Sequence, residues 1–259
     1  MDLFITIVVC LIAGLGAGLG TGFAGMSAAA VITPMLVTFL DMPAYSAIGI
    51  ALASDVLASA VSTYTYYKNR NIDIRNGSIM MVSVLTFTMV GSYLASFMPN
   101  EAMSSSSVFV TLVLGIKFIV KPVNTTKEAM QSISPKKRFV QSILSGIMIG
   151  FICGFYGAGG GMMMLLILTV VLGYELKTAV GTSVFIMTFT ALTGAVSHFV
   201  IDKESPDLLV LVLCVIFTLV FARLGARFAN KASTKTLNRA TGVVLVVLGI
   251  IVLGVGKLL

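Results

Sequence analysis

Long stretches without a charged residue are the feature that most limits the folds open to this chain. Residues 3–40 and 139–173 contain no Asp, Glu, Lys or Arg. Of all residues, 58% are hydrophobic and 10% are charged, whereas soluble domains carry about 25% charge. A signal peptide would supply one apolar run, but here such runs recur along the chain. The sequence therefore predicts an all-α polytopic protein of the cell membrane, surrounded by lipid.

A spaced glycine pattern occurs twice. An offset of 132 residues aligns Gly14, Gly18, Gly22 and Gly25 with Gly146, Gly150, Gly154 and Gly157, and a later offset of 134 aligns Gly91 with Gly225. A pattern held at one offset indicates an internal duplication. We expect a first transmembrane repeat over 1–122, a basic cytoplasmic linker over 123–138 and a second transmembrane repeat over 139–259.

Each repeat divides into five apolar segments, so about ten helical segments are expected. The predicted segments are 3–23, 26–40, 44–67, 77–97 and 103–120, then 139–155, 161–173, 177–200, 207–229 and 238–257. The second segment of each repeat is shorter than the roughly 20 residues that cross a bilayer. Short, glycine-interrupted segments at matching positions of two halves are typical of transporter binding sites. Whether these segments span the membrane or re-enter it is left open.

The charged loops predict the orientation of the repeats. Residues 117–138 and 223–239 are rich in Lys and Arg, and 68–75 is also net basic, whereas 201–207 is acidic. Basic loops face the cytoplasm, which also accounts for the net charge of +7 without a nucleic-acid partner. Both termini are then external, and the repeats have inverted topology.

The glycines fall into two groups with different expected roles. Those spaced by four residues share one helical face and are expected to let helices pack closely. The second group forms the breaks themselves, GFAGMSAAA at 22–30 and GFYGAGGGM at 154–162. Each break leaves backbone N–H groups without a partner at the start of a short helix, where the helix dipole favours an anion. The alternative is a tight turn without a ligand. The candidate anion-binding residues here are Gly22, Gly25, Ser27, Gly154, Tyr156, Gly157, Gly159 and Gly160.

Two further groups lie in the third segments. Thr182 and Ser183, together with Gly49 at the matching position of the first half, are candidates for binding sulfonate or carboxylate oxygens. Alternatively, the two hydroxyls bond back to carbonyls of their own helix. Asp55 lies at the middle of 44–67, where a carboxylate is costly and is a functional candidate. It either relays protons that drive anion transport or has a structural role bonded to a facing Ser or Thr.

At these residues the chain resembles the sulfite exporter TauE/SafE family. The resemblance rests on GFAGMSAAAVITPML at 22–36, GFYGAGGGMMMLLIL at 154–168 and TAVGTSVF at 178–185, and it extends over nearly the whole chain. It implies an integral membrane transporter of sulfite, an organosulfonate or another small organic anion.

The function expected is therefore secondary transport of a small, sulfur-containing or carboxylate anion by alternating access, coupled to a proton or a cation. No P-loop motif G-x-x-x-x-G-K-[ST] is present, and the dispersed Cys residues and single His offer neither a catalytic pair nor a metal site. We expect no enzyme activity, no metal and no cofactor. An anion channel and a structural or signalling membrane protein are the alternatives, and a homodimer is compatible with the sequence.

Overall fold

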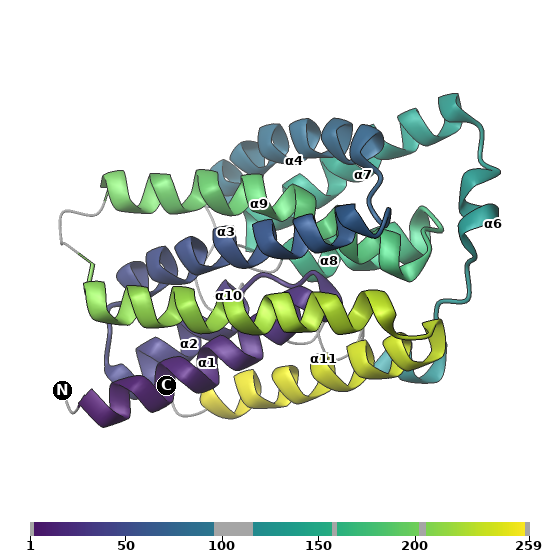
Figure 1. Cartoon of the computed structure of the whole chain (residues 1–259). Coiled ribbons are helices and arrows are strands. Elements are labelled where there is room, and N and C mark those ends of the chain that lie inside the picture. The colour runs from purple at the N-terminus through teal and green to yellow at the C-terminus, as the bar shows by residue number, and fades with distance from the viewer. Residues whose placement is uncertain (1–2, 96–115, 157–159, 202–205, 257–259) are drawn as a thin grey trace.

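The protein is all-α over the part of the chain that its computed structural model describes, residues 3–95, 116–156, 160–201 and 206–256 (Figure 1). No strand occurs in these ranges. The helices are α1 (Leu3–Ala24), α2 (Ala29–Leu40), α3 (Ala44–Lys68), α4 (Ile74–Ala95), α6 (Lys127–Gln131), α7 (Pro135–Tyr156), α8 (Gly160–Leu166), α9 (Leu176–Ile201), α10 (Leu208–Lys231) and α11 (Thr234–Gly256), with the π-helical turn η1 (Ile167–Val171) after α8.

Four of the described helices are long and apolar enough to cross a membrane: α1, α3, the Leu176–Val196 part of α9, and α10. The second segment of each half is short, as expected. α2 has 12 residues, and α8 has 7 before the chain widens into η1. The expected segment 161–173 is therefore two different helical forms rather than one. The expected segment 103–120 lies mostly outside the described residues. These elements confirm the polytopic all-α fold.

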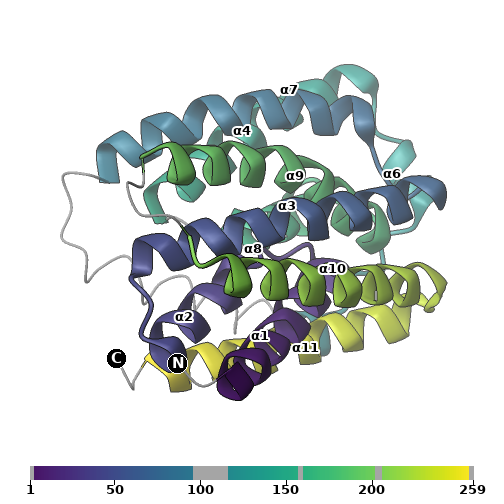
Figure 2. The same ribbon diagram turned by 60° about the vertical axis from the view of Figure 1, so that its left-hand side comes forward.

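Corresponding helices of the two halves run in opposite directions. In Figures 1 and 2, α1 and α3 run away from the end of the bundle that holds both termini, whereas α7 and α9 run towards it. The loops that follow α3 and α10, together with α6, gather at the opposite end. All the basic loops thus share one end, which is the grouping that the charge pattern predicts for a cytoplasmic face.

Aspartates set the start of the fourth helix of each half. Asp207 accepts hydrogen bonds from the backbone N–H groups of Leu209 and Val210 at the start of α10. Asp73 accepts one from the Asn76 N–H at the start of α4. Such caps satisfy donors that have no partner within the helix. The two aspartates are 134 residues apart, which is the later offset of the sequence repeat.

The glycine stripes hold the first helix of each half against the fourth helix of the other. The α1–α10 and α4–α7 pairs have the most extensive packing among the described helices. A Cβ atom added at Gly18 would lie 2.6 Å from the Thr218 carbonyl oxygen, and one added at Gly150 would lie 2.5 Å from the Val84 carbonyl oxygen. Only glycine permits backbones to approach this closely. The packing role expected of these stripes is confirmed.

Candidate functional site

The first break, residues 25–28 between α1 and α2, begins at a glycine with a left-handed backbone. Gly25 has φ of 58°, which glycine adopts without steric cost. A Cβ atom there would also lie 2.8 Å from the Ser183 hydroxyl oxygen. The α1 helix ends here because its last turn closes through the Gly25 N–H to the Thr21 carbonyl, at 3.0 Å. Both conformation and space therefore require glycine at this position.

Hydroxyl side chains satisfy the carbonyl groups around this break, three from other helices and one, Thr21, from α1 itself. Four hydroxyl donors act on it, from four different helices: Tyr66 to the Gly22 carbonyl at 2.8 Å, Thr241 to Phe23 at 3.3 Å, Ser183 to Gly25 at 3.1 Å, and Thr21 to Met26 at 2.8 Å. Buried backbone groups without partners are costly, particularly in lipid. The unwound segment is therefore an ordered part of the core whose backbone is held in one conformation.

The side chain of Asp55, a residue of α3, lies at the N-terminus of α2. Its carboxylate accepts a hydrogen bond from the Ser27 hydroxyl at 2.7 Å and another from the Ser59 hydroxyl at 3.0 Å, and the Ala28 backbone also hydrogen-bonds to it. The side chain is buried. In the described part of the chain, all of these partners are uncharged. A carboxylate of the protein itself thus occupies the place where the sequence predicts a bound anion.

The two breaks touch one another. A Cβ atom added at Gly161, in the first turn of α8, would lie 2.6 Å from the Gly25 carbonyl oxygen and 2.8 Å from the Ser27 backbone nitrogen. It would also lie 2.7 Å from the Met187 sulfur. Gly161 is not among the site residues predicted from the sequence, although it aligns with Ala29 at the repeat offset. The start of each short helix, one from each half, therefore meets the other directly.

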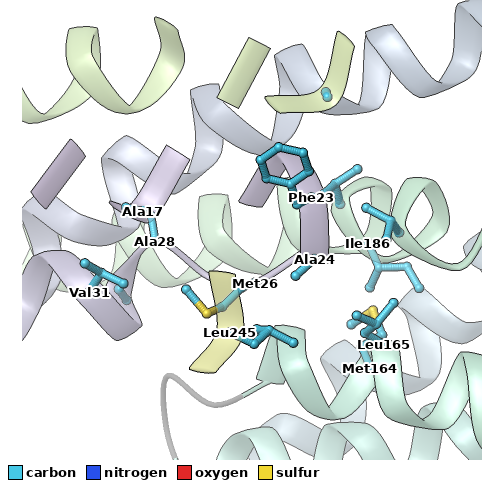
Figure 3. Close-up of a cluster of buried hydrophobic side chains, with 14 of the residues drawn as sticks. Ala17, Phe23, Ala24, Met26, Ala28, Val31, Met164, Leu165, Ile186 and Leu245 are labelled. Atoms are coloured by element: carbon cyan, nitrogen blue, oxygen red, sulfur yellow. The ribbon is translucent and has the colours of Figure 1, made fainter. Parts of the chain in front are cut away.

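Apolar side chains surround this meeting point. Figure 3 shows Met26 next to Leu245 of α11, with Met164 and Leu165 of α8 below Ile186 of α9. These five side chains are buried. Apolar side chains therefore enclose the described part of this meeting point, and the carbonyl groups around the first break accept hydrogen bonds from protein side chains.

The other predicted site residues fall into three groups. Ser183 is at the break, whereas Thr182 faces another way and accepts a hydrogen bond from the Asp73 backbone N–H at 3.1 Å. Gly22 and Gly49 are buried in α1 and α3. The remainder belong to the second break: Gly154 and Tyr156 end α7, Gly160 begins α8, and Gly157 and Gly159 lie outside the described residues.

Two cysteines that look isolated in the sequence are neighbours in the fold. Cys10 of α1 and Cys214 of α10 are buried, and their thiols are free and hydrogen-bonded to each other. No group of three or more His, Cys, Asp or Glu side chains suited to a metal ion occurs within the described ranges. The pair lies between α1 and α10, within their packing seam.

The chain is similar over nearly its whole length to proteins named as probable membrane transporters. The chain is 25% identical to the probable membrane transporter protein YunE of Bacillus subtilis (strain 168), over 93% of this chain and 95% of the relative. It is 22% identical to the probable membrane transporter protein YdhB of the same organism, over 91% and 96%. A probable membrane transporter protein of Haemophilus influenzae is 26% identical over 96% and 98%.

A family model described as sulfite exporter TauE/SafE matches residues 10–252. The match includes both glycine breaks, Asp55 and the linker, and it spans nearly all of the described helices. The chain is thus a multi-pass membrane protein that belongs to the sulfite exporter TauE/SafE family of membrane transporters.

Proposed function

We propose that the protein is a secondary transporter that moves a small anion, such as sulfite, an organosulfonate or a related carboxylate, by alternating access between inverted repeats over 1–122 and 139–259. The observation that carries the proposal is the contact between the two breaks, where Gly161 of one half abuts Gly25 and Ser27 of the other. Discontinuous helices that meet between inverted halves are where such transporters bind substrate.

The packing of the helices supports alternating access. α3 and α9 occupy corresponding positions and pack against each other. However, α3 packs far more extensively against α10 than α9 packs against α4 among the described residues. These two pairs would be equivalent in a symmetric arrangement. Two inverted halves that differ in conformation can exchange their conformations, and this exchange opens the site to the opposite side of the membrane.

The environment of Asp55 favours a proton as the coupling ion. A Na⁺ site at a broken helix is built from unwound backbone carbonyls. Here the carbonyls of Gly22 and Gly25 already accept hydrogen bonds from Tyr66 and Ser183. A buried carboxylate with uncharged partners is costly when ionised, and a proton removes that cost. Protonation of Asp55 would also make the start of α2 more attractive to a substrate anion, since like charges repel.

Asp55→Asn tests this proposal in proteoliposomes. The amide keeps the shape of the side chain but cannot take up a proton, so we expect anion uptake driven by a pH gradient to fall to the background rate. Asp207→Asn is the matched control, since asparagine also caps helices well, and its uptake should stay at the level of the unmodified protein. Full pH-driven uptake by Asp55→Asn would contradict proton coupling through this residue.

Counterflow distinguishes a carrier from a channel. Vesicles loaded with unlabelled sulfite or sulfoacetate should accumulate the labelled anion transiently and saturably if one site is exposed alternately to each side. A channel would give no such accumulation. If a panel of small anions produced neither uptake nor thermal stabilisation of the purified protein, a structural or signalling role would replace the transport proposal.

A further inference from the structure

The loop between α3 and α4, residues 69–73, lies directly on the start of α9. A Cβ atom added at Gly181 would lie 2.0 Å from the Asn71 carbonyl oxygen, so backbone meets backbone without a gap. Two residues on, the Asp73 N–H donates to the Thr182 hydroxyl at 3.1 Å. A loop of the first half thus covers the first turns of a helix of the second half, at the end of the bundle that bears the basic loops (Figure 1).

The side chain of Asn71 ties this loop to α10 as well. Its amide nitrogen donates to the Asn230 side-chain oxygen at 2.7 Å, and Asn71 is only 9% exposed. Lys177, at the start of α9, donates to the Asn230 backbone carbonyl at 2.9 Å. Asn230 is therefore held from two sides, and the ends of three helices from both halves are joined through polar contacts.

The linker between the halves contributes a further contact. The Lys127 ammonium group, at the start of α6, donates to the Arg70 carbonyl at 2.6 Å and to the Asn71 side-chain oxygen at 3.1 Å. Arg70 has φ of 56°, a left-handed conformation that is strained for a residue with a Cβ atom. Such strain persists where the surroundings hold it, often in parts that switch. Lys127 binds the carbonyl that this strained residue presents.

Tyr66, which is buried, anchors the loop 69–73 from the α3 side. The Tyr66 carbonyl accepts a hydrogen bond from the Asn71 N–H at 2.9 Å, while the Tyr66 hydroxyl bonds to Gly22 at the first break. On the other side of the loop, the Tyr174 hydroxyl donates to the Asp73 carboxylate at 2.9 Å. Burial, with a smaller effect of Asp73, raises the pKa of Tyr174, so this donor stays protonated. The loop is thereby connected to the candidate site.

A polar face of α3 runs from the candidate site towards this loop. Asp55, Ser59, Ser62 and Tyr66 follow one another at intervals of three or four residues, so they share one side of the helix. Ser62 is fully buried, and its hydroxyl has no hydrogen-bond partner among the described residues. A buried hydroxyl of this kind is commonly satisfied by an ordered water. The polar face therefore marks a route between Asp55 and the loop.

We propose that residues 69–73 form the cytoplasmic gate of the transporter and that Lys127 of the linker is its latch. The inference rests on the proposed transport function. Opening this end requires the halves to move apart, and the hydrogen bonds from Asn71 to Asn230 and from Asp73 to Thr182 both cross between them. Lys127 holds the loop closed from the linker, which makes it a positioning residue rather than one that touches the substrate.

Accessibility of a buried reporter tests the gate. Ser62→Cys is placed in a chain whose three native cysteines are replaced by alanine, and reconstituted vesicles receive a membrane-impermeant maleimide on the face that bears the linker. We expect Lys127→Ala to raise the labelling rate about fivefold, which corresponds to the loss of a net hydrogen-bond contribution of about 1 kcal/mol. Asn71→Ala removes two hydrogen bonds and should raise the rate further.

Lys136→Ala is the matched control. Lys136 carries the same charge at the end of the same linker and is exposed, and it is not one of the residues whose side chains hydrogen-bond to the loop in the described structure. Unchanged labelling in this control, with faster labelling in the Lys127 and Asn71 variants, supports the gate. Equal rates in all variants, or an equal rise with Lys136→Ala, would overturn it. Labelling needs no substrate, so this failure would be distinct from failure of pH-driven uptake.

Discussion

Replacement of Gly161 by alanine tests the contact on which the transport proposal depends. The new Cβ atom would approach the Gly25 carbonyl oxygen to 2.6 Å and the Ser27 nitrogen to 2.8 Å. Both are backbone atoms of the first break, which other helices hold in place, so they cannot yield cheaply. The third neighbour, the Met187 sulfur at 2.7 Å, ends a flexible side chain and can swing away.

The size of the effect follows from overpacking. Forcing an extra methyl group into a close-packed interior costs about 1–3 kcal/mol. Gly254→Ala is the matched control, since Gly254 lies in α11 and a Cβ atom added there would meet no described atom within 4 Å. Both changes gain similar helix propensity, so the difference between them is about 2 kcal/mol. For a chain of this size, that lowers the melting temperature by about 6 °C.

The assay is thermal unfolding of both purified variants in detergent, followed by anion uptake in vesicles. Gly161→Ala should melt at a lower temperature than Gly254→Ala and should lose uptake, because the two breaks are forced apart. Adding Met187→Ala should restore little, since the backbone contacts remain. The reasoning is refuted if Gly161→Ala melts with the control and transports normally, or if the double variant recovers completely.

Two further predictions concern stability. Gly18→Ala should destabilise the α1–α10 pair by about 1–3 kcal/mol. Gly225→Ala is the control in the same seam, since its Cβ atom would meet its nearest atom at 3.4 Å and the melting temperature should stay unchanged or rise. Equal melting temperatures of the two variants would contradict the close packing at Gly18. Tyr66→Phe leaves the Gly22 carbonyl without its hydrogen-bond donor and should lower the free energy of unfolding by about 1–3 kcal/mol. Tyr64→Phe, at an exposed position, should leave it unchanged. An equal loss of stability in both variants would contradict a specific role for the hydrogen bond from Tyr66 to Gly22.

Much of the fold could be predicted because its signals are local. Apolar runs and glycine positions give the helices, the short second segment of each half and the glycine stripes. The predicted segment 44–67 corresponds to α3 at Ala44–Lys68. The sequence did not reveal that the segment predicted over 161–173 divides into α8 and η1, since a change of helical form depends on how neighbouring helices accommodate the turn.

The candidate site was only partly predictable. Asp55 stands out because an acidic residue is costly within an apolar run, and Gly25 because only glycine suits the turn. The partners of these residues cannot be read from neighbouring sequence, however. The hydrogen bond from Ser183 to Gly25 joins residues 158 positions apart. Thr182, adjacent to Ser183, points to the α3–α4 loop instead, since neighbours on a helix face different directions.

By itself, the sequence determined that this chain is an α-helical membrane protein with a duplicated pattern and two broken helices. Composition and glycine spacing are local properties of the chain, and lipid strictly requires the segments that cross it to be apolar and helical. Only the tertiary structure decided that the breaks meet at Gly161, that Asp55 occupies the start of α2, and that Lys127 reaches the α3–α4 loop. Those contacts depend on how helices from distant parts of the chain approach each other, which no local pattern encodes.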